Sequence, residues 1–362
     1  MRALTATVAL AALKCPPALA EDAAATTAVP TLAQILAASG ISATGYLAVS
    51  DYHSSGLGTF HQFDAHHVAT QLDQGALTIA YKPKDGFGTL VDVLAGEDAR
   101  IVRVAEDGHD NEFDVLQAYV QYAAGPVTVV GGKYLTLAGA EVIDPTGDTN
   151  FSRSLLFYSE PMTHTGVRAT WTATPTITLT GGVNNGWNVV SDSCGGKTAE
   201  VGVTVTPGKQ LSLSAQAYFG KAPSPYGMDR SLVDLVGTYN ITAALSIVLS
   251  YDRGWQSQPD SGDMGWNGLA AYLNYAISAQ WRLSARGEYF DDAGGFVTGA
   301  RQKLAEGTLT LGYAPTSHFE LRLEGRHDRS NHPTFLAATS GPQPTPFEDA
   351  QTEFAVQGLF KF

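Results

Sequence analysis

The chain has 362 residues, 16% of them charged and 10% aromatic, and its 35 acidic residues against 22 basic ones give a net charge of −13. A chain this acidic is a poor binder of nucleic acid, and its charged fraction is low for a soluble protein. Its two cysteines are Cys15 and Cys194. An internal disulfide is therefore excluded if Cys15 leaves with an export signal.

The first residues predict such a signal. An apolar stretch over residues 3–13 is followed by the small pair Ala18 and Ala20, so we expect residues 1–20 to be a cleaved signal peptide. The next segment, 21–39, is expected to be a periplasmic tether that ends in a short helix. No later apolar run approaches the about 18 residues of a membrane helix, so strands alone are expected to span a membrane.

From residue 41 onward, apolar and polar residues alternate, as in strands with one wet face and one apolar face. A clear example is the segment 211–219. The alternation predicts about sixteen strands, near residues 41–52, 65–81, 86–96, 113–123, 126–136, 163–173, 176–186, 197–206, 210–220, 231–241, 244–254, 265–277, 280–290, 304–314, 318–328 and 351–362. The apolar parity changes near Gln74 and Gly75, which predicts a β-bulge in the second strand.

The connections between these strands alternate in length. Tight turns such as 124–125 and 278–279 separate longer segments such as 97–112 and 137–162. Short turns at one end and long loops at the other predict an all-β transmembrane antiparallel barrel over residues 40–362, with short periplasmic turns and long extracellular loops. We therefore expect the protein in the bacterial outer membrane, in contact with its lipids and lipopolysaccharide.

The chain ends in an alternating apolar set, which includes Phe354, Val356, Phe360 and Phe362. A terminal aromatic residue after such alternation resembles the recognition signal of bacterial outer-membrane barrels. Phe360 and Phe362 are therefore the expected signal for the barrel-assembly machinery.

The parity of the strands also predicts which charged residues face the barrel interior. An unpaired charge on the lipid face near mid-membrane is unfavourable by about 2–4 kcal/mol, so charges belong inside. The predicted inward charges are Asp92, Lys133, Arg168, Glu200, Asp234, Asp252, Arg282, Arg286, Glu288, Glu306, Glu320, Arg322, Glu324 and Arg326. A barrel of about sixteen strands leaves room for an aqueous channel.

The longest loop within the barrel body, 137–162, is expected to fold inward and narrow this channel. Its charged residues would face Lys133, Arg168 and the wall arginines across a constriction, where opposed charges discriminate between ions without tight binding. The alternative is an external loop packed on the barrel rim. The predicted constriction residues are Lys133, Glu141, Asp144, Asp148, Arg153, Glu160, Arg168, Arg282, Arg286, Arg322 and Arg326.

Several short segments, in their order and spacing, resemble a known family. They are Gly96-Glu97-Asp98-Ala99, Gly131-Gly132-Lys133, Gly139-Ala140-Glu141, Asn150-Phe151-Ser152-Arg153-Ser154, Glu160-Pro161, His164-Thr165-Gly166-Val167-Arg168 and Asn184-Asn185-Gly186-Trp187-Asn188. Together they resemble the β-barrel porin family described as OmpL-like. The resemblance implies a bacterial outer-membrane barrel with channel activity.

The expected function is that of a porin, a passive diffusion channel for small hydrophilic solutes or ions. Acidic loops favour cations at its mouth. Two alternatives are a non-conducting barrel with an adhesion or envelope-structural role, and an outer-membrane lipid hydrolase. No enzyme activity and no cofactor are expected, and His66, His67 and His109 do not match a metal-ligand spacing. Analogy with sixteen-stranded porins suggests a homotrimer.

Overall fold

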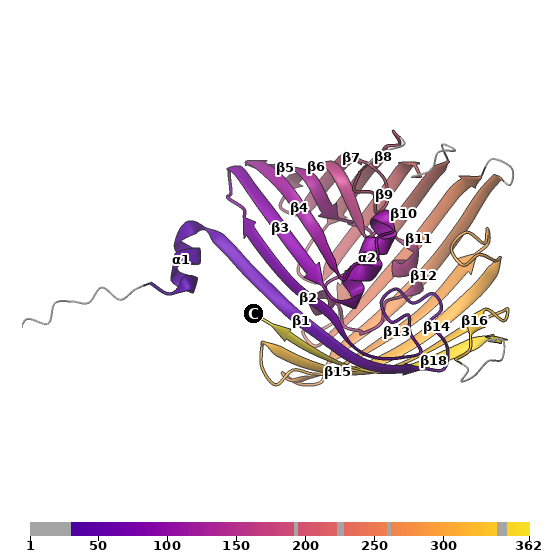
Figure 1. The fold of residues 1–362 in the computed structure, drawn as a ribbon. Coiled ribbons are helices and arrows are strands. Elements are labelled where there is room, and N and C mark those ends of the chain that lie inside the picture. The colour runs from indigo at the N-terminus through magenta and orange to yellow at the C-terminus, as the bar shows by residue number, and fades with distance from the viewer. Residues whose placement is uncertain (1–29, 192–194, 223–227, 259–261, 339–345) are drawn as a thin grey trace, which may run out of the picture.

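The structure is a computed structural model that describes residues 30–191, 195–222, 228–258, 262–338 and 346–362. Its main feature is a closed barrel of sixteen antiparallel strands (Figure 1). Strands that follow one another along the chain are neighbours in the barrel, and the last strand closes it against the first. The predicted signal peptide and Cys194 lie outside the described residues.

The strands follow the expected order closely. They are β1 (Ile41–Ser54), β2 (Val68–Tyr81), β3 (Gly86–Ala95), β4 (Phe113–Ala124), β5 (Val127–Leu135), β6 (Thr163–Thr174), β7 (Ile177–Asn184), β8 (Thr198–Val205), β9 (Leu211–Lys221), β10 (Asp229–Asn240), β11 (Leu245–Gln258), β12 (Gly262–Ala276), β13 (Trp281–Asp292), β14 (Gln302–Tyr313), β15 (Phe319–Ser330) and β18 (Ala350–Lys361). The predicted fold, an antiparallel barrel of about sixteen strands, is confirmed.

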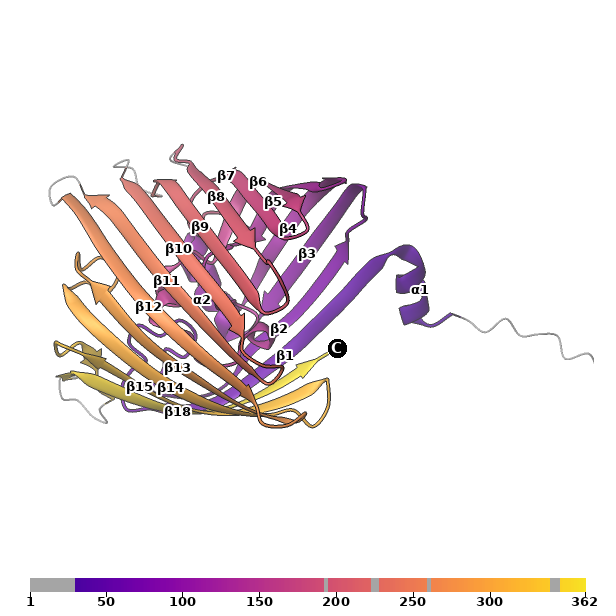
Figure 2. The ribbon, with the colours of Figure 1, turned by 180° about the vertical axis from the view of Figure 1, so that it is seen from behind.

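The remaining elements lie before the barrel or in its long loops. They are α1 (Leu32–Ser39), α2 (Glu97–Asp107), the 3₁₀ turn η1 (Pro145–Gly147), α3 (Leu155–Ser159), β16 (Phe335–Leu336) and β17 (Phe347–Glu348). Of these, only α1 was expected, and it projects from the barrel at the start of β1 (Figures 1 and 2). Among the described residues, no helix has the length and apolar character needed to cross a membrane.

The two faces of the strands divide as the alternation predicts. In β15, Leu323 is 47% exposed on the outer face, whereas its neighbours Arg322 and Glu324 are 1% and 6% exposed. Aromatic pairs lie beside the tight turns, for example Trp281 and Tyr313 with ring centroids 4.4 Å apart. An apolar outer face edged by such rings is the surface that a bilayer requires.

The predicted β-bulge lies in β2. Ala48 of β1 is opposite Gln74, but the next residue, Val49, is opposite Leu72, so Asp73 is the extra residue. Both Asp73 and Gln74 consequently turn their side chains into the buried interior. The Gln74 amide then donates hydrogen bonds to Asp98 of α2 at 2.7 Å and to a carbonyl of the third long loop at 2.9 Å. The bulge thus links the wall to the segments inside the barrel.

The helix α2 occupies a segment that was expected to be an irregular loop. It ends at Gly108, which adopts a left-handed conformation with φ of 76° and is well suited to glycine. Its buried residues Ala99 and Val102 pack against inward-facing Leu94 and Leu116 of neighbouring strands. The helix therefore covers part of the inner wall formed by β2, β3 and β4.

Candidate functional site: the third long loop and the inner wall

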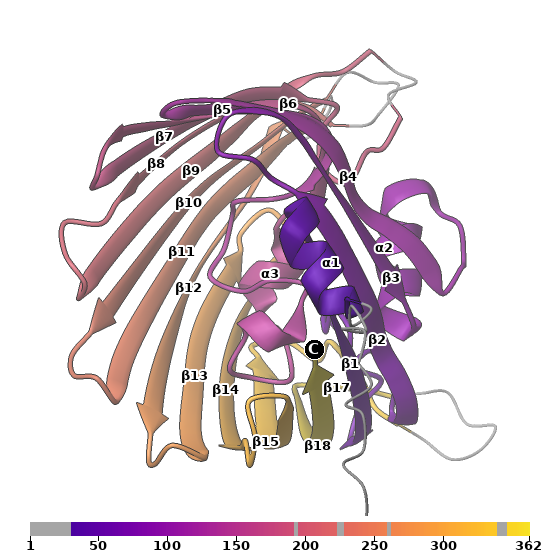
Figure 3. The same cartoon turned by 90° about the vertical axis from the view of Figure 1, so that its left-hand side faces the viewer.

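The third long loop, residues 136–162, connects β5 to β6 and carries both η1 and α3. It lies inside the barrel rather than on its rim, because α3 contacts β12 and β13 and η1 contacts β18. Figure 3 shows α3 within the ring of strands. The loop therefore occupies the position in which it can narrow a channel.

Two wall carboxylates hold the loop by its backbone. Glu324 of β15 accepts hydrogen bonds from the amides of Phe151 and Ser152, at 2.6 and 2.9 Å. Glu288 of β13 accepts hydrogen bonds from the buried amides of Leu155 and Leu156 at the start of α3, at 2.7 and 2.8 Å. Hydrogen bonds to an ionised acceptor are strong, and here each carboxylate uses both oxygens. The loop is thus fixed in register against the wall.

The wall arginines hold the same loop through its carbonyls. Arg322 donates to the carbonyl oxygens of Pro145 and Asp148 at 2.9 and 2.8 Å, and Arg326 donates to that of Arg153 at 2.6 Å. The remaining two, Arg282 and Arg286, donate to the carbonyls of Thr149 and Ser152. We call the inner faces of β13, β14 and β15, which carry these arginines and glutamates, the charged wall.

Arg286 is the most heavily used of the four. Its guanidinium contacts Glu141 of the loop at 2.8 Å and Glu306 of β14 at 3.0 Å, and its side chain is fully buried. A buried ion pair is stable only when its geometry is good and its atoms are hydrogen-bonded, as the Arg286 guanidinium is here. The Glu141 carboxylate also accepts a hydrogen bond from the amide of Ser154 at 2.8 Å. Arg286 therefore links the loop to two strands of the charged wall.

Within the loop, Arg153 folds back on its own segment. Its guanidinium lies 3.0 Å from the Asp148 carboxylate and donates to the carbonyls of Val142 and Ile143 at 2.9 Å. Burial raises the pKa of Asp148 to about 7, although Arg153 acts in the opposite direction. Arg153 also lies over the ring of Phe157, with the centroid 5.7 Å away. These contacts stiffen the loop and leave Arg153 with no exposed face.

The remaining constriction candidates do not oppose one another as expected. Lys133 pairs with Glu106 of α2 and with Asp114 at 2.8 Å. Arg168 pairs with Glu200 on a nearby strand at 2.9 Å and lies over the ring of Tyr134.

Two loop acids likewise have other surroundings than the wall cations. Asp144 caps η1 by accepting a hydrogen bond from the amide of Thr146 at 2.8 Å, and Glu160 lies beside Asp234 and Asp252. The sequence did not indicate the contact between Lys133 and Glu106, because the alternating pattern gave no sign of the helix α2 that carries Glu106.

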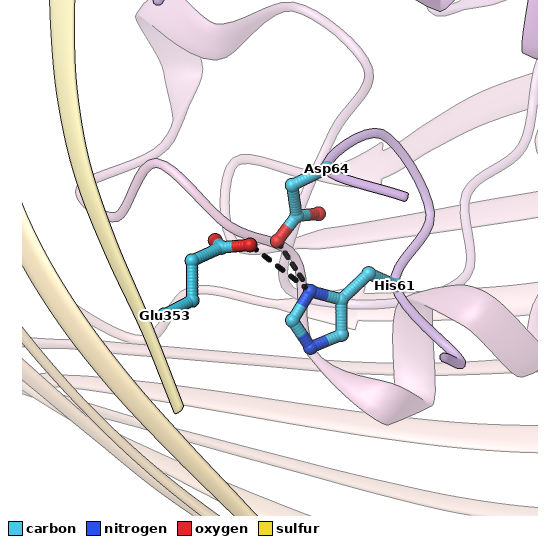
Figure 4. Close-up of side chains that lie close together, drawn as sticks. All are labelled: His61, Asp64 and Glu353. Carbon is cyan, nitrogen blue, oxygen red and sulfur yellow. Dashed lines mark ion pairs between the residues drawn. The ribbon is translucent and has the colours of Figure 1, made fainter. Parts of the chain in front are cut away.

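The first long loop, residues 55–67, enters the barrel as well. Figure 4 shows His61 between two carboxylates, with Nδ1 2.7 Å from Asp64 and 3.7 Å from Glu353 of β18. Its Nε2 lies 2.9 Å from Asp328 of β15. Burial and Arg326 lower the pKa of His61, but the carboxylates outweigh them and raise it well above its usual value. The sequence did not point to His61, because two of its three carboxylate partners, Asp328 and Glu353, are far away in the chain.

The inner wall opposite the arginines has a different character. Toward the tight-turn end of β6 to β11, its inward side chains are small, uncharged and partly exposed: Thr170, Thr180, Thr204, Ser214, Thr238 and Ser246. We call this set the hydroxyl wall. Thr170 is opposite Thr180 and Thr204 is opposite Ser214, so the hydroxyls form neighbouring pairs across the strands.

The third loop leaves the hydroxyl wall uncovered. Within the described part of the chain, no hydrogen bond joins these six residues to the loop. A cavity of about 100 Å³ separates the loop from β11 and β12, and it is lined by Asp148, Asn150, Val248 and Asn274 among others. A larger cavity of about 390 Å³ lies at the tight-turn end beside Gln280 and Glu320. Open space therefore borders the third loop on two sides, next to β11 and β12 and at the tight-turn end of the barrel.

On its extracellular side, the loop meets apolar residues. Leu155 and Leu156 belong to a buried cluster that also contains Trp187, Trp266 and Phe290. The rings of Trp187 and Trp266 meet edge to face, with centroids 6.3 Å apart. The interior is therefore polar at the tight-turn end and apolar above α3.

A closed barrel with an apolar outer face, a charged interior and an inward third loop defines the porin class of outer-membrane proteins. Comparison with known families agrees. The chain belongs to the family described as putative beta-barrel porin-2, OmpL-like, whose model matches residues 36–362. The protein is thus an outer-membrane porin, as the sequence predicted. No curated protein matches the sequence.

Solved structures are similar over nearly the whole barrel. The anion-selective porin from Comamonas acidovorans is 12% identical, with a TM-score of 0.63 over 89% of this chain and 99% of that chain. OprB from Pseudomonas putida is 10% identical, with a TM-score of 0.63 over 91% and 96%. The trimer form of OmpT from Vibrio cholerae is 13% identical, with a TM-score of 0.63 over 89% and 99%. Identities this low show a common fold alone.

Proposed function

We propose that small hydrophilic solutes and ions diffuse passively through this barrel along the hydroxyl wall. The observation that carries the proposal is the contrast between the two inner walls: the charged wall is covered by the third loop, whereas Thr180, Thr204 and Ser214 remain partly exposed. Hydroxyl groups can replace the hydration shell of a passing solute without binding it tightly, which conduction requires.

The third loop is the proposed constriction. The charged wall fixes the position of the loop. Asp148 and Asn150 of the loop line the cavity beside β11. The charged candidates of the constriction act mainly by holding the loop in place, since Arg286, Arg322 and Arg326 are almost completely buried. Solute size is then controlled by the loop, and ion preference by whichever charges remain accessible.

The proposal is tested by planar-bilayer recording of the refolded protein. Stepwise, ohmic conductance is expected, and acidic loops predict a cation-selective reversal potential in a salt gradient. Correctly inserted protein that gives a silent bilayer would overturn the channel proposal and favour the non-conducting barrel. A lipase or deacylase assay on the same preparation, expected to be negative, tests the hydrolase alternative.

The proposal includes how the barrel reaches its place. A cleaved signal over residues 1–20 would export the chain, and Phe360 and Phe362 would serve the barrel-assembly machinery. Both phenylalanines are exposed at the end of β18 and accessible to a partner or to lipid. We propose a homotrimer as the assembled form. Sedimentation of the protein in detergent, corrected for bound detergent, distinguishes a trimer from a monomer.

A further inference from the structure

Three carboxylates meet where the third loop returns to the wall. Glu160 follows α3 directly, Asp234 lies in β10, and Asp252 lies opposite Asp234 in β11. One oxygen from each carboxylate can be chosen so that all three lie within 4.8 Å of one another. The third loop and the β10–β11 hairpin, which is far from it in the sequence, therefore direct negative charge at one point.

These carboxylates are removed from solvent. Glu160 is 7% exposed, and Asp234 and Asp252 are both 0% exposed. Both oxygens of Asp234 and both of Asp252 lack a hydrogen-bond donor among the described residues. In that same part of the chain, no salt bridge joins any of the three to a lysine, arginine or histidine. An unpaired buried anion is strongly unfavourable, so these groups must either be protonated or bind a cation.

Other carboxylates on the inner wall differ from these three. The Glu200 carboxylate, which is as deeply buried, is paired with Arg168 at 2.9 Å, and Glu288 receives two backbone amides. Glu200 and Glu288 thus receive hydrogen-bond donors from the chain itself. At Glu160, Asp234 and Asp252 it provides oxygen ligands and no cationic partner.

We propose that Glu160, Asp234 and Asp252 bind a divalent cation, with Ca²⁺ as the ion that fits their chemistry. Ca²⁺ takes about six to eight oxygen ligands in flexible geometry, commonly from carboxylates, carbonyls and water, and three carboxylates can supply up to six. The site has no nitrogen or sulfur ligand, which argues against zinc. The bound ion would join the third loop to β10 and β11, across the barrel from its arginine anchors. This inference goes beyond conduction and does not depend on it.

The test is calcium titration of the full-length mature protein, refolded without lipopolysaccharide and stripped with a chelator. Isothermal titration calorimetry is expected to show one saturable Ca²⁺ site per chain. Asp252→Asn should weaken binding by at least about tenfold, the scale that even an outer-shell change can cause. The matched control is Asp110→Asn, which removes the same charge from a side chain that is 75% exposed and should leave the affinity unchanged.

A thermal-shift measurement provides a second readout with a second variant. Ca²⁺ should raise the Tm of the wild type, as any ligand of the folded state does, but not that of Glu160→Gln or Asp252→Asn. The heat-modifiable migration of each barrel on a gel verifies that it is folded. A wild type without a saturable site, or a folded Asp252→Asn barrel that binds Ca²⁺ as tightly as the wild type, would overturn the proposal.

Discussion

The charged wall and the hydroxyl wall face each other across the same barrel, but over the described residues only the charged wall is hydrogen-bonded to the third loop. On β13 to β15, the arginines and glutamates form hydrogen bonds with the third loop. Arg286 donates to a loop carbonyl at 2.7 Å, and Glu324 accepts from a loop amide at 2.6 Å. On the hydroxyl wall, at the tight-turn end of β6 to β11, the six inward threonines and serines remain partly exposed. Buried charges in this barrel therefore act as structural anchors, and the uncharged wall is the one left for solutes.

This comparison changes how an inward charge is interpreted. A charged side chain that faces the lumen can be in contact with water. Alternatively, it can form hydrogen bonds with the backbone of a loop and so offset the desolvation of that backbone. Arg322 is 1% exposed and contacts three loop carbonyls, so it belongs to the second kind. Parity along a strand identifies the inner face but does not distinguish these two roles.

The largest effect is expected when an anchor of the charged wall is removed. Arg286→Ala leaves Glu141 and Glu306 buried without their partner, and breaking a buried pair in this way lowers the free energy of unfolding by about 3–5 kcal/mol. Denaturant unfolding in detergent measures the loss, and released loops should also raise single-channel conductance. Arg329→Ala is the control, because Arg329 is exposed on the outer face of β15. Equal stability of the two variants would contradict the anchor role.

Cysteine accessibility sharpens the comparison directly. In a chain with Cys194→Ser, Ser214→Cys on the hydroxyl wall should react with a charged, water-soluble methanethiosulfonate reagent during bilayer recording. Conductance should then fall by roughly a third or more, since the added group narrows the path. The matched variant is Thr310→Cys on the charged wall, where Thr310 is 0% exposed beneath the loop. Thr310→Cys should not react. A reactive Thr310→Cys together with an unreactive Ser214→Cys would place the solute path on the charged wall and contradict the proposal.

The pH dependence of stability tests the first loop, which is anchored on the same side as the arginines. His61 has a raised pKa in the folded protein, so its stabilising effect is complete below the pKa of the unfolded state, about 6.5, and is lost as the pH rises through the folded-state pKa. Between those two values the free energy of unfolding should fall by up to about 1.4 kcal/mol per pH unit.

That slope should disappear in His61→Asn and persist in His332→Asn, whose histidine is exposed. Unfolding curves at a series of pH values from about 6 to about 9 provide the measurement. A slope in His61→Asn equal to that of the wild type would show that other groups cause the pH dependence.

The smallest effect is expected at the end of α2. Gly108→Ala forces an alanine to adopt φ of 76°, which destabilises by about 1 kcal/mol, although its Cβ would meet nothing within 4 Å. Gly287→Ala in β13 is the control, because it also meets nothing and has an ordinary strand conformation. Conductance should not change in either variant, because neither residue touches the hydroxyl wall.

Sequence patterns predicted the barrel well because lipid and water impose a strict alternation on each strand. Leu323 beside Arg322 is one of many positions where that rule alone assigns the face. The helix α2 escaped this reasoning, since Ala99 and Val102 give only a short helical period within a highly charged segment. It supplies Glu106, one of the two carboxylates that pair with Lys133, and no local pattern indicated this contact.

Partners across the barrel were beyond the reach of any local pattern. The inward position of Glu160 was expected, but no local pattern indicates that it meets Asp234 and Asp252 of the β10–β11 hairpin. Likewise, nothing near His61 in the sequence indicates Asp328 or Glu353. The sequence therefore predicts which residues are available inside, whereas the return path of each loop determines which of them meet.

The pairing of β1 with β18 has a consequence for biogenesis. The amide of Phe362 donates to the carbonyl of Gly45 at 2.9 Å, and a side chain at position 45 would collide with the phenylalanine ring. The first and last strands of the barrel thus form its closing seam. Until they pair, the sheet is open and has two unpaired edges. Such edges cannot face hydrocarbon and attract other chains in water. A nascent barrel of this kind must have its unpaired edges protected until β18 pairs with β1. A chain that ends before β18 would leave the sheet open.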